Sequence, residues 1–297
     1  MNERLHLTEA TVLDSLSPDK PVLIAGPTAS GKSDLAMRIA QAQGGRIINA
    51  DASQVYDCWR VLTARPTPAD CALAAHALYG HVEARTPFSV GHWLRDAAPL
   101  VETGPRPIIV GGTGLYFMAL TNGLADIPPI PAKIRAAGDS LSHAEMLQAL
   151  DTRTRNRIAT DNPARVQRAW EVLAATGKGL ADWQDDTAPP LLPLRKTHAI
   201  VFDTPKDWLN ERISLRFDMM IKHGALDEAR VVLPEYDPAL PAHRAIGAPE
   251  LIAYLRGETT LPEAREAAII ATRQFAKRQR TWFRSKMKEW AIYTPCL

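Results

Sequence analysis

Short apolar runs alternate with stretches of helical periodicity along the first part of the chain. Three runs, at 21–25, 46–49 and 107–110, have the length and composition of buried strands. Apolar residues recur at helical spacing in the segments near 34–42, 69–79 and 90–101. Strands that alternate with helices in this way predict a doubly wound parallel sheet, and therefore an α/β fold. The preceding residues, 1–20, predict a short helix or an arm.

The pattern changes at a proline-rich stretch, residues 126–131. Proline cannot continue a helix, so this stretch favours an extended hinge. Residues 132–177 then show a helical, arginine-rich pattern, and a second loose stretch at 185–193 ends it. Strand character returns at 198–202, which indicates that the sheet resumes after a helical insert.

Helices are expected after this last strand at 207–223, 226–233 and 262–288. We therefore expect three regions in chain order, which are the first part of an α/β core at 1–125, a helical insert at 126–193, and the rest of the core with basic C-terminal helices at 194–297.

The composition limits the possible classes of protein. Of the 297 residues, 46% are hydrophobic and 23% are charged, which is enough for a real core and for one to two domains. The net charge of +2 does not by itself indicate a nucleic-acid partner. No run reaches the ~18 apolar residues of a membrane span, and residues 1–20 lack the apolar segment of a signal peptide.

Three cysteines, Cys58, Cys71 and Cys296, lie far apart in the sequence. Neither a metal motif nor a disulfide framework has this spacing, so we expect a cytoplasmic protein with reduced thiols. Because no heptad or other dimer seam is visible, a monomer is expected.

One motif carries strong chemical information. The stretch Gly26-Pro27-Thr28-Ala29-Ser30-Gly31-Lys32-Ser33 fits the phosphate-binding pattern G-x-x-x-x-G-K-[ST], and it lies between an expected strand and an expected helix. Glycines let such a loop wrap closely, so that successive N–H groups and the helix N-terminus face one anion. The motif predicts an oligophosphate or pyrophosphate site, with Lys32 on the terminal phosphates and the Ser33 hydroxyl on Mg²⁺, but it does not say which compound binds.

Two further segments follow strands, where ligands of α/β sheets bind. Asp51 comes directly after the second strand and is a candidate general base, a candidate Mg²⁺ ligand or a helix N-cap. The segment 111–114, Gly-Gly-Thr-Gly, ends the third strand. It is either a tight strand-to-helix turn or a backbone surface that a flat substrate can approach, with the Thr113 hydroxyl as a polar contact.

Basic residues gather in the insert and in the C-terminal helix. On the helix, spacings of four, three and four place four of them on one face, Arg273, Lys277, Arg280 and Arg284. The insert repeats the theme with Arg153, Arg155, Arg157, Arg165 and Arg168. A basic face is often merely solvated, but two such segments in a near-neutral chain favour RNA or DNA binding. Arg212 and Arg216 lie one helical turn apart. One of them could neutralise a leaving phosphate, or both could be surface charges.

These segments together resemble one family. In order along residues 20–290, the chain reads GPTASGKS, NADASQVY, GGTGLY, NPARVQRAWEVL, RISLRFDMM followed by HGALDEAR, and TRQFAKRQRTWFR. The same ordered set occurs in the tRNA dimethylallyltransferases, also called tRNA isopentenyltransferases or IPP transferases. The resemblance implies a P-loop NTPase-like fold with a helical insertion domain that binds tRNA.

The reaction that the resemblance implies is a prenyl transfer. A dimethylallyl group moves from dimethylallyl diphosphate to N6 of the adenosine 3′-adjacent to the anticodon, in the anticodon stem-loop of a tRNA, and pyrophosphate leaves with the help of Mg²⁺. The loop Gly26–Ser33 then holds the diphosphate, and Ser33 binds Mg²⁺. Four residues match catalytic positions of the family, Asp51, Lys32, Arg216 and Thr28.

The resemblance also implies tRNA contacts, which it places at Asp51, Ala52, Ser53, Gln54, Thr113, Arg135, Ala164, Arg165, Val166, Gln167, Arg168, His243, Arg244, Ala245, Ile246, Gly247, Ala248, Arg273, Lys277 and Arg280. The chain departs from the usual family pattern at Ala52, where serine is common, and at Ala248-Pro249, where a tyrosine and a basic residue are common.

Three rival interpretations are weighed on the sequence. A non-catalytic RNA-binding protein on an enzyme scaffold explains the basic segments, but the intact Lys32, Asp51 and Arg216 argue against it. A P-loop kinase of a small metabolite explains Lys32 and Ser33 but gives no role to the basic segments. A prenyltransferase acting on free AMP or ADP explains the motifs but not an insert of this size.

Overall fold

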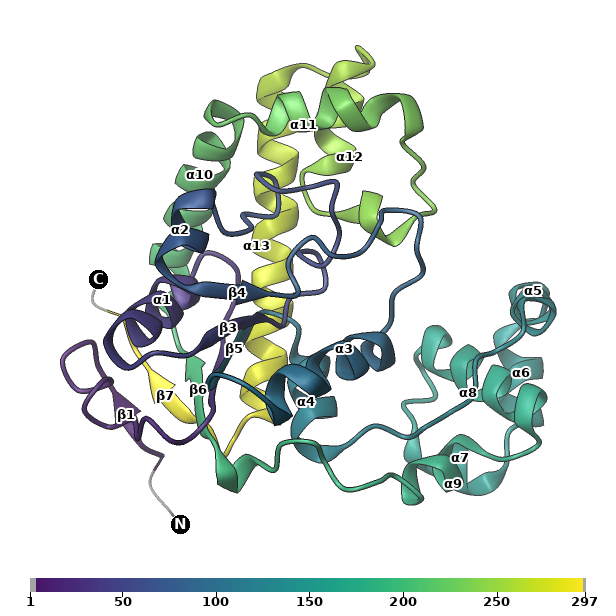
Figure 1. The fold of residues 1–297 in the computed structure, drawn as a ribbon. Helices are drawn as coiled ribbons and strands as arrows, with labels where there is room; N and C mark the ends of the chain where they lie inside the picture. Colours follow the sequence, from purple (N-terminus) through teal and green to yellow (C-terminus); the bar gives the residue numbers. More distant parts are fainter. Residues whose placement is uncertain (1–3, 296–297) are drawn as a thin grey trace. The chain divides into compact units, whose positions relative to one another are not determined.

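The computed structural model describes residues 4–295 and divides the chain into two compact units. The first unit comprises residues 1–118 and 192–297, and the second comprises residues 119–191. We describe each unit by itself. The expected α/β class is confirmed, with helices and a parallel sheet in the first unit (Figure 1).

The sheet of the first unit has seven strands in the described part of the chain, in the order β1-β7-β6-β2-β5-β3-β4. All six pairings are parallel. The bounds are β1 His6–Leu7, β2 Val22–Ala25, β3 Arg46–Asn49, β4 Ala75–Ala77, β5 Pro107–Gly111, β6 His198–Phe202 and β7 Ala291–Tyr293. Strand β2 lies between β5 and β6, so the loop that follows it opens at the middle of the sheet's carboxyl edge.

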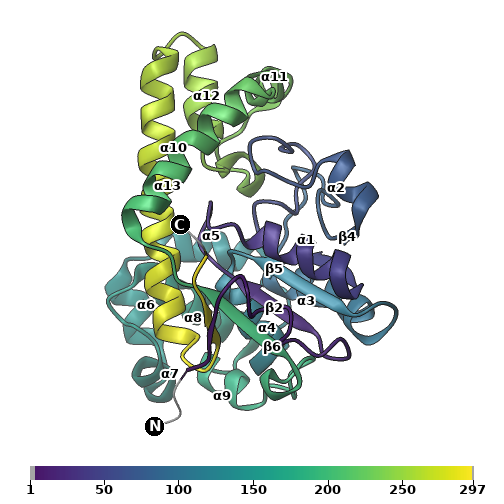
Figure 2. The same cartoon turned by 90° about the vertical axis from the view of Figure 1, so that its left-hand side faces the viewer.

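The helices of the first unit cover the sheet and extend beyond it (Figure 2). Their bounds are α1 Lys32–Gln43, α2 Pro68–Leu73, α3 Val90–Glu102, α4 Gly114–Asn122, α10 Lys206–Lys222, α11 Ala225–Val232, α12 Ala248–Leu255 and α13 Leu261–Lys286. Short 3₁₀ turns occupy Leu194–Lys196, Leu233–Glu235 and Pro241–Arg244. The boundary between the two units falls within α4.

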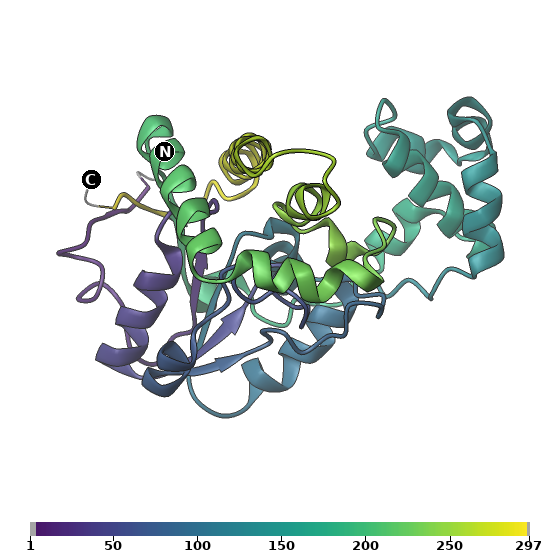
Figure 3. The same cartoon turned by 90° about the horizontal axis from the view of Figure 1, so that it is seen from above.

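Two apolar cores hold the first unit together. One lies between the sheet and α1, where Ile24, Leu35, Ile39 and Ile108 are fully buried. The other joins α10–α13 to the loop after β3 and contains Trp59, Phe217 and Leu251. Burial of each such side chain stabilises the fold by about 1.5–3 kcal/mol. Helices α12 and α13 run side by side in this second core, as Figure 3 shows from above.

The second unit is helical. Its helices are α5 Ala132–Ser140, α6 His143–Ala149, α7 Thr152–Arg157, α8 Pro163–Thr176 and α9 Leu180–Asp185. Polar caps define several ends: Ser142 caps α6 with Glu145 at the reciprocal position, and Asn162 caps α8 before Pro163. The unit closes on a small core of Met146, Leu150, Val166 and Ala169.

Some expected elements are wrong in part. Instead of one helix at 69–79, the chain forms α2 and then strand β4, which pairs with β3. Within the described residues of 1–20, the structure has turns and the short strand β1, not a helix. β1 pairs with β7, close to the end of the chain, and neither strand carried a local signal. Cys58 and Cys71 are free thiols, whereas Cys296 lies outside the described residues.

Candidate active site

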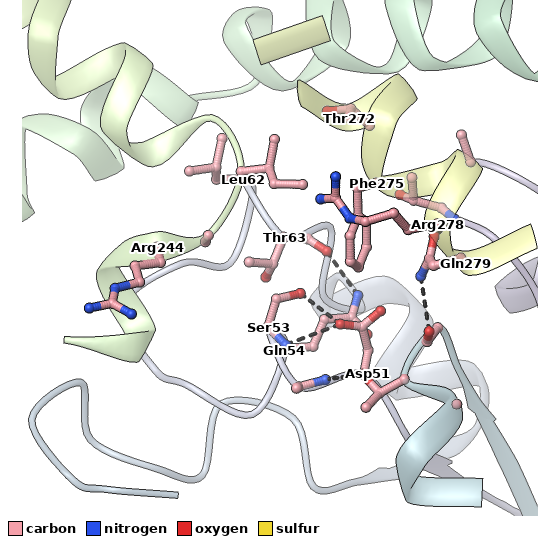
Figure 4. Close-up of a pocket in the computed structure, with 18 of the residues that line it drawn as sticks. Asp51, Ser53, Gln54, Leu62, Thr63, Arg244, Thr272, Phe275, Arg278 and Gln279 are labelled. Atoms are coloured by element: carbon pink, nitrogen blue, oxygen red, sulfur yellow. Dashed lines mark hydrogen bonds between the residues drawn. The ribbon is translucent and has the colours of Figure 1, made fainter. Parts of the chain in front are cut away.

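Loops at the carboxyl ends of β2, β3 and β5 surround the main pocket of the first unit. Its volume is about 730 Å³, and α10, α13 and the 3₁₀ turn at Pro241–Arg244 complete its wall (Figure 4). The pocket brings together Lys32, Asp51, Thr113 and Arg216, which lie far apart in the sequence. Thr28, Ser33 and Gln54 also line it.

The phosphate-binding loop has the backbone that its glycines permit. Gly31 has φ 90° and precedes α1, and a left-handed φ of this kind is strained for residues with a Cβ. Gly26 is needed for close packing, because a Cβ there would lie 2.8 Å from Ser30 Oγ and 2.9 Å from Phe202 Cβ. The N-terminus of α1 therefore opens into the pocket with its first N–H groups unpaired within the helix, an arrangement that binds anions.

Two cations lie at this loop. Removal from bulk water lowers the pKa of the Lys32 ammonium to about 8, with the Asp51 charge opposing and the Arg216 charge adding to this effect. Burial also lowers the pKa of the Arg216 guanidinium, and the charge of Asp51 opposes that shift. Two desolvated cations beside one carboxylate leave a site with excess positive charge, which an anionic ligand would relieve.

Asp51 is held by its neighbours in the loop after β3. Its Oδ1 accepts hydrogen bonds from Ser53 N at 3.1 Å and from Ser53 Oγ at 2.7 Å. Buried Asn49 fixes the Asp51 peptide, since Asn49 Oδ1 accepts from Asp51 N at 2.8 Å and Asn49 Nδ2 donates to Asp51 O at 3.0 Å. Asp51 Oδ2 has no hydrogen-bond partner among residues 4–295. The helix N-cap interpretation is wrong, because residues 52–54 form a turn and not the start of a helix.

The segment 111–114 forms a tight strand-to-helix turn, and α4 begins at Gly114. Its glycines make room for protein atoms: a Cβ at Gly111 would lie 2.0 Å from Ala50 O, and one at Gly114 would lie 2.0 Å from the Trp282 ring. The Thr113 hydroxyl accepts a hydrogen bond from Ala52 N at 2.9 Å. This residue therefore ties the β3 and β5 loops together while it lines the pocket.

Helix α13 presents a different face to the pocket from its basic one. The lining residues on this helix are Thr272, Phe275, Arg278, Gln279, Trp282 and Phe283. At about 100° per residue, the row of predicted basic positions lies on the other side of the helix. Arg273 Nη2 instead donates to Ser214 Oγ of α10 at 3.0 Å, and Arg284 approaches Asp203 at 3.6 Å.

The pocket residues of α13 were not predicted as site residues. Phe275, Arg278, Gln279 and Trp282 are not among the contacts predicted on this helix, which are Arg273, Lys277 and Arg280. The spacing of three and four residues between 272, 275, 279 and 282 was the available signal, but a helical stripe of this kind more often faces a core than a ligand.

The segment 243–248 contributes backbone and small side chains more than polar groups. His243 is buried, and its Nδ1 accepts a hydrogen bond from Asp237 N at 2.9 Å. Its ring is therefore a structural group, which corrects its assignment as a tRNA contact. Arg244 is exposed at the pocket rim, while Ala245 and Ile246 line the wall.

The second unit, taken by itself, exposes some of its predicted contacts and buries others. Arg135, Ala164, Arg165 and Arg168 are exposed. Val166 is fully buried in the core of this unit, so its side chain cannot contact a ligand, which corrects that prediction. Two clustered arginines are paired within the unit: Arg153 with Asp182 and Asp185, and Arg157 with Asp185.

A second pocket of about 530 Å³ opens on the other residues of the phosphate-binding loop. It is lined by Gly31 and Asp34, by His76 and Tyr79, and by Leu215 and Met219 of α10. Five residues line both pockets, Ala29, Lys32, Ser33, Gln54 and Arg216. The two pockets therefore adjoin at the cationic end of the loop.

Within residues 4–295, acidic, histidine and cysteine side chains do not gather in groups of three that could hold a metal ion. None of the helices in the described part of the chain is long and apolar enough to cross a membrane.

Comparisons with known proteins agree with the geometry. The family model described as IPP transferase matches residues 54–286, and the one described as isopentenyl transferase matches residues 20–76. The tRNA dimethylallyltransferase of Roseobacter denitrificans is 69% identical over 278 residues, which is 94% of this chain and 100% of that protein.

Two solved structures are also similar. The tRNA isopentenylpyrophosphate transferase of Bacillus halodurans has a TM-score of 0.66 and 29% identity, over 93% of this chain and 90% of that one. A eukaryotic dimethylallyltransferase acting on tRNA has a TM-score of 0.79 over 93% of this chain and 73% of that one, and its 24% identity supports the fold alone. The family model covers most of this chain, and the match to the Roseobacter relative covers the whole length of that relative. The chain therefore belongs to the IPP transferase family.

Proposed function

We propose that this protein transfers the dimethylallyl group of dimethylallyl diphosphate to N6 of the adenosine 3′-adjacent to the anticodon in a tRNA and releases pyrophosphate. The observation that carries this proposal is the convergence of a phosphate-binding loop, two cations and one carboxylate in a single pocket. The names of the relatives supply the substrates, tRNA and a dimethylallyl donor.

The diphosphate of the donor binds at residues 26–33. The first N–H groups of α1 and the Lys32 ammonium face the terminal phosphate, and Arg216 lies across from them on α10. As the bond to carbon lengthens, negative charge grows on the leaving pyrophosphate. Fixed cations in a site partly removed from water stabilise that charge without reorganising. The Thr28 side chain lines the same wall, and we assign it with them to the catalytic groups.

Mg²⁺ fits this site through the Ser33 hydroxyl and the diphosphate oxygens. Mg²⁺ prefers oxygen ligands and keeps several waters, so it needs few protein ligands. Ser33 is exposed at the start of α1 and lines both pockets, which suits such an ion. When bound, the ion would supply further positive charge to the pyrophosphate.

The acceptor amine meets Asp51. In the transfer, N6 forms a bond to C1 of the donor, the C1–O bond breaks, and its electron pair leaves with pyrophosphate. The N6 proton goes to Asp51, whose Oδ2 has no hydrogen-bond partner among residues 4–295. An aromatic amine is a poor nucleophile, so orientation by Asp51 contributes as much as its basicity.

The two adjoining pockets give each substrate its own entrance. The pocket with Asp51, Phe275 and Trp282 suits a flat base that has left the stack of the anticodon loop. The second pocket reaches the phosphate-binding loop from the side of Leu215 and Met219. The adenosine and the donor then meet at Lys32, Ser33 and Arg216, where an in-line displacement can occur.

The body of the tRNA contacts exposed positive groups. We assign this role to Arg244 and Arg278 at the pocket rim and to the exposed Arg135, Arg165 and Arg168 of the helical insert. Ala52, Ser53, Gln54 and Thr113 border the base itself.

Acceptor competition tests the proposal. The protein is incubated with dimethylallyl diphosphate, Mg²⁺ and either an unmodified tRNA, free AMP or free ADP, and the digested nucleosides are analysed by mass spectrometry. We expect prenylated adenosine from the tRNA alone. Prenylation of AMP or ADP in preference to tRNA would contradict the proposal, as would ATP-dependent phosphorylation of a small molecule without any prenyl transfer.

A further inference from the structure

Gln279 is a buried polar side chain in the C-terminal third of α13, with 5% of its surface exposed. Its Oε1 accepts a hydrogen bond from Thr28 N at 2.9 Å, and its Nε2 donates to Gly112 O at 3.0 Å. Thr28 belongs to the phosphate-binding loop after β2, and Gly112 belongs to the loop after β5. One side chain thus bridges two loops that it meets from a third element.

The bridge lies where the sheet ends. Strands β2 and β5 are paired neighbours, and Gly26 N donates to Gly111 O at 3.3 Å just beyond their paired residues. Beyond that point the loops are joined through the carboxamide, which has the same donor and acceptor as a peptide. Gln279 therefore extends the β2–β5 pairing past the point where the backbones separate, and it satisfies two backbone groups that would otherwise lack partners.

The carboxamide also lies close to Asp51. A Cβ built on Gly112 would lie 2.3 Å from Gln279 Nε2 and 3.0 Å from Asp51 Oδ2. Only a glycine leaves room for both side chains at this place. The loop that Gln279 holds is therefore the one against which the Asp51 carboxylate packs.

Helix α13 gives Gln279 a rigid base. Trp282, one turn further along, packs against Gly114 so closely that a Cβ there would lie 2.0 Å from its ring. Phe283 is also buried, with 3% of its surface exposed. Because these two rings hold α13 in place one turn beyond Gln279, the two hydrogen bonds of Gln279 transmit the position of α13 to both loops.

We propose, on the basis of the function proposed above, that Gln279 is a positioning residue that sets the separation between the donor loop at Thr28 and the acceptor-side loop at Gly112. Its hydrogen bonds keep the diphosphate cradle and the Asp51 carboxylate in register for the transfer. The residue does not exchange protons or electrons with either substrate. Loss of the bridge lets the two loops shift, and a displacement of ~1 Å in such a site costs on the order of 10²-fold in rate.

The first variant is Gln279→Met, which keeps the length of the side chain and removes both hydrogen bonds. The matched control is Gln274→Met, the same substitution at an exposed position of the same helix. For the folded Gln279→Met protein we expect kcat to fall ~10- to 100-fold, with KM for tRNA and for the donor within ~threefold of the wild type. The control should leave all three unchanged.

The second variant is Gln279→Glu, which adds a pH readout that a merely structural role would not give. The ionised carboxylate accepts from Thr28 N but cannot donate to Gly112 O, whereas the protonated acid can do both. Burial and the nearby Asp51 charge raise the pKa of the new carboxyl group. The activity of this variant relative to the wild type should therefore rise as the pH falls from about 8 to about 6.

The outcomes separate the two proposals. The positioning role is overturned if the wild type is active and the kcat of Gln279→Met lies within threefold of the wild-type value. It is also overturned if the ratio of Gln279→Glu activity to wild-type activity does not change with pH. If Gln279→Met does not fold, the pH ratio of Gln279→Glu decides the question alone. A wild type without prenyl transfer refutes the proposed function instead, whatever the variants do.

Discussion

Replacement of Lys32 by methionine should stabilise the free protein while it abolishes transfer. Desolvation lowers the pKa of Lys32 from 10.5 to about 8, a difference that corresponds to about 3 kcal/mol against the charged form. The folded state then binds fewer protons than the unfolded chain between these two pKa values. The penalty is therefore fully present below pH 8 and disappears as the pH rises towards 10.5.

The expected gain is smaller than this limit, because part of the Lys32 side chain remains exposed. We expect Lys32→Met to raise the free energy of unfolding by about 1–3 kcal/mol at pH 7, and thus to raise Tm by roughly 2–5 °C for a chain of this size. Pyrophosphate should raise the Tm of the wild type much more than that of the variant, because it binds beside the charged ammonium.

Scanning calorimetry of both proteins at pH 7 and at pH 10, with and without pyrophosphate, checks these statements. Lys288→Met, at an exposed lysine, is the control and should leave Tm within about a degree. A Lys32→Met protein that is less stable than the wild type at pH 7 would refute the reasoning. So would a gain of the same size at pH 10, because the lowered pKa would then not be its cause.

Three further predictions concern the surroundings of the site. Arg278→Ala should weaken tRNA binding in filter-binding assays and reduce the slope of log affinity against log salt concentration by about one. The neighbouring Lys277→Ala, on the other side of α13, should change this slope less. A larger change in Lys277→Ala than in Arg278→Ala would place the tRNA on the far face of α13. Glu228→Ala should lower the free energy of unfolding in denaturant titrations by about 2–4 kcal/mol. The Glu228 carboxylate accepts hydrogen bonds from the three backbone N–H groups of residues 60–62, at 2.7–3.0 Å. An unchanged denaturation midpoint would show that this loop is held by other contacts. Gly114→Ala should reduce kcat/KM for tRNA at least tenfold in the prenylation assay, because the Cβ of the new alanine would displace the Trp282 ring. Activity within twofold of the wild type would show that the Trp282 ring moves aside freely.

Local patterns predicted the central part of the fold. The buried runs at 22–25, 46–49 and 107–111 are strands, and the loop after the first of them wraps closely at its glycines, as expected, with Gly31 in the left-handed region. The long C-terminal helix begins next to the reciprocal cap of Thr260 and Glu263, a signal that the sequence contains. These features depend on residues close together in the chain, and so the sequence shows them.

Other elements depend on partners far away in the chain. Strand β4 pairs with β3 only at the edge of the sheet, and β1 pairs with β7 across almost the whole sequence. Two or three residues carry no periodicity that a pattern could reveal. Helix α12 follows a glycine with φ 97° at Gly247, and its apolar face is defined by α11 and α13.

The candidate site shows the same division. The phosphate-binding loop and Asp51 followed from motifs and from their position after strands. Gln279 could not be recognised, because a polar residue on a helix is exposed in most proteins and only the assembled fold buries this one. The basic positions of α13 share a face as expected, but the fold turns that face away from the pocket. Arg273 therefore donates a hydrogen bond to Ser214 of α10.

The most direct test of the central claim is the stoichiometry of one transfer reaction. An unmodified tRNA is incubated with dimethylallyl diphosphate and Mg²⁺, and prenylated adenosine and free pyrophosphate are measured in the same sample for the wild type and for Asp51→Asn. We predict one prenyl group at the adenosine beside the anticodon for each pyrophosphate released, with turnover lost in the variant and tRNA binding retained. Pyrophosphate without prenylated adenosine, or an Asp51→Asn protein within a few-fold of the wild type, would contradict the account.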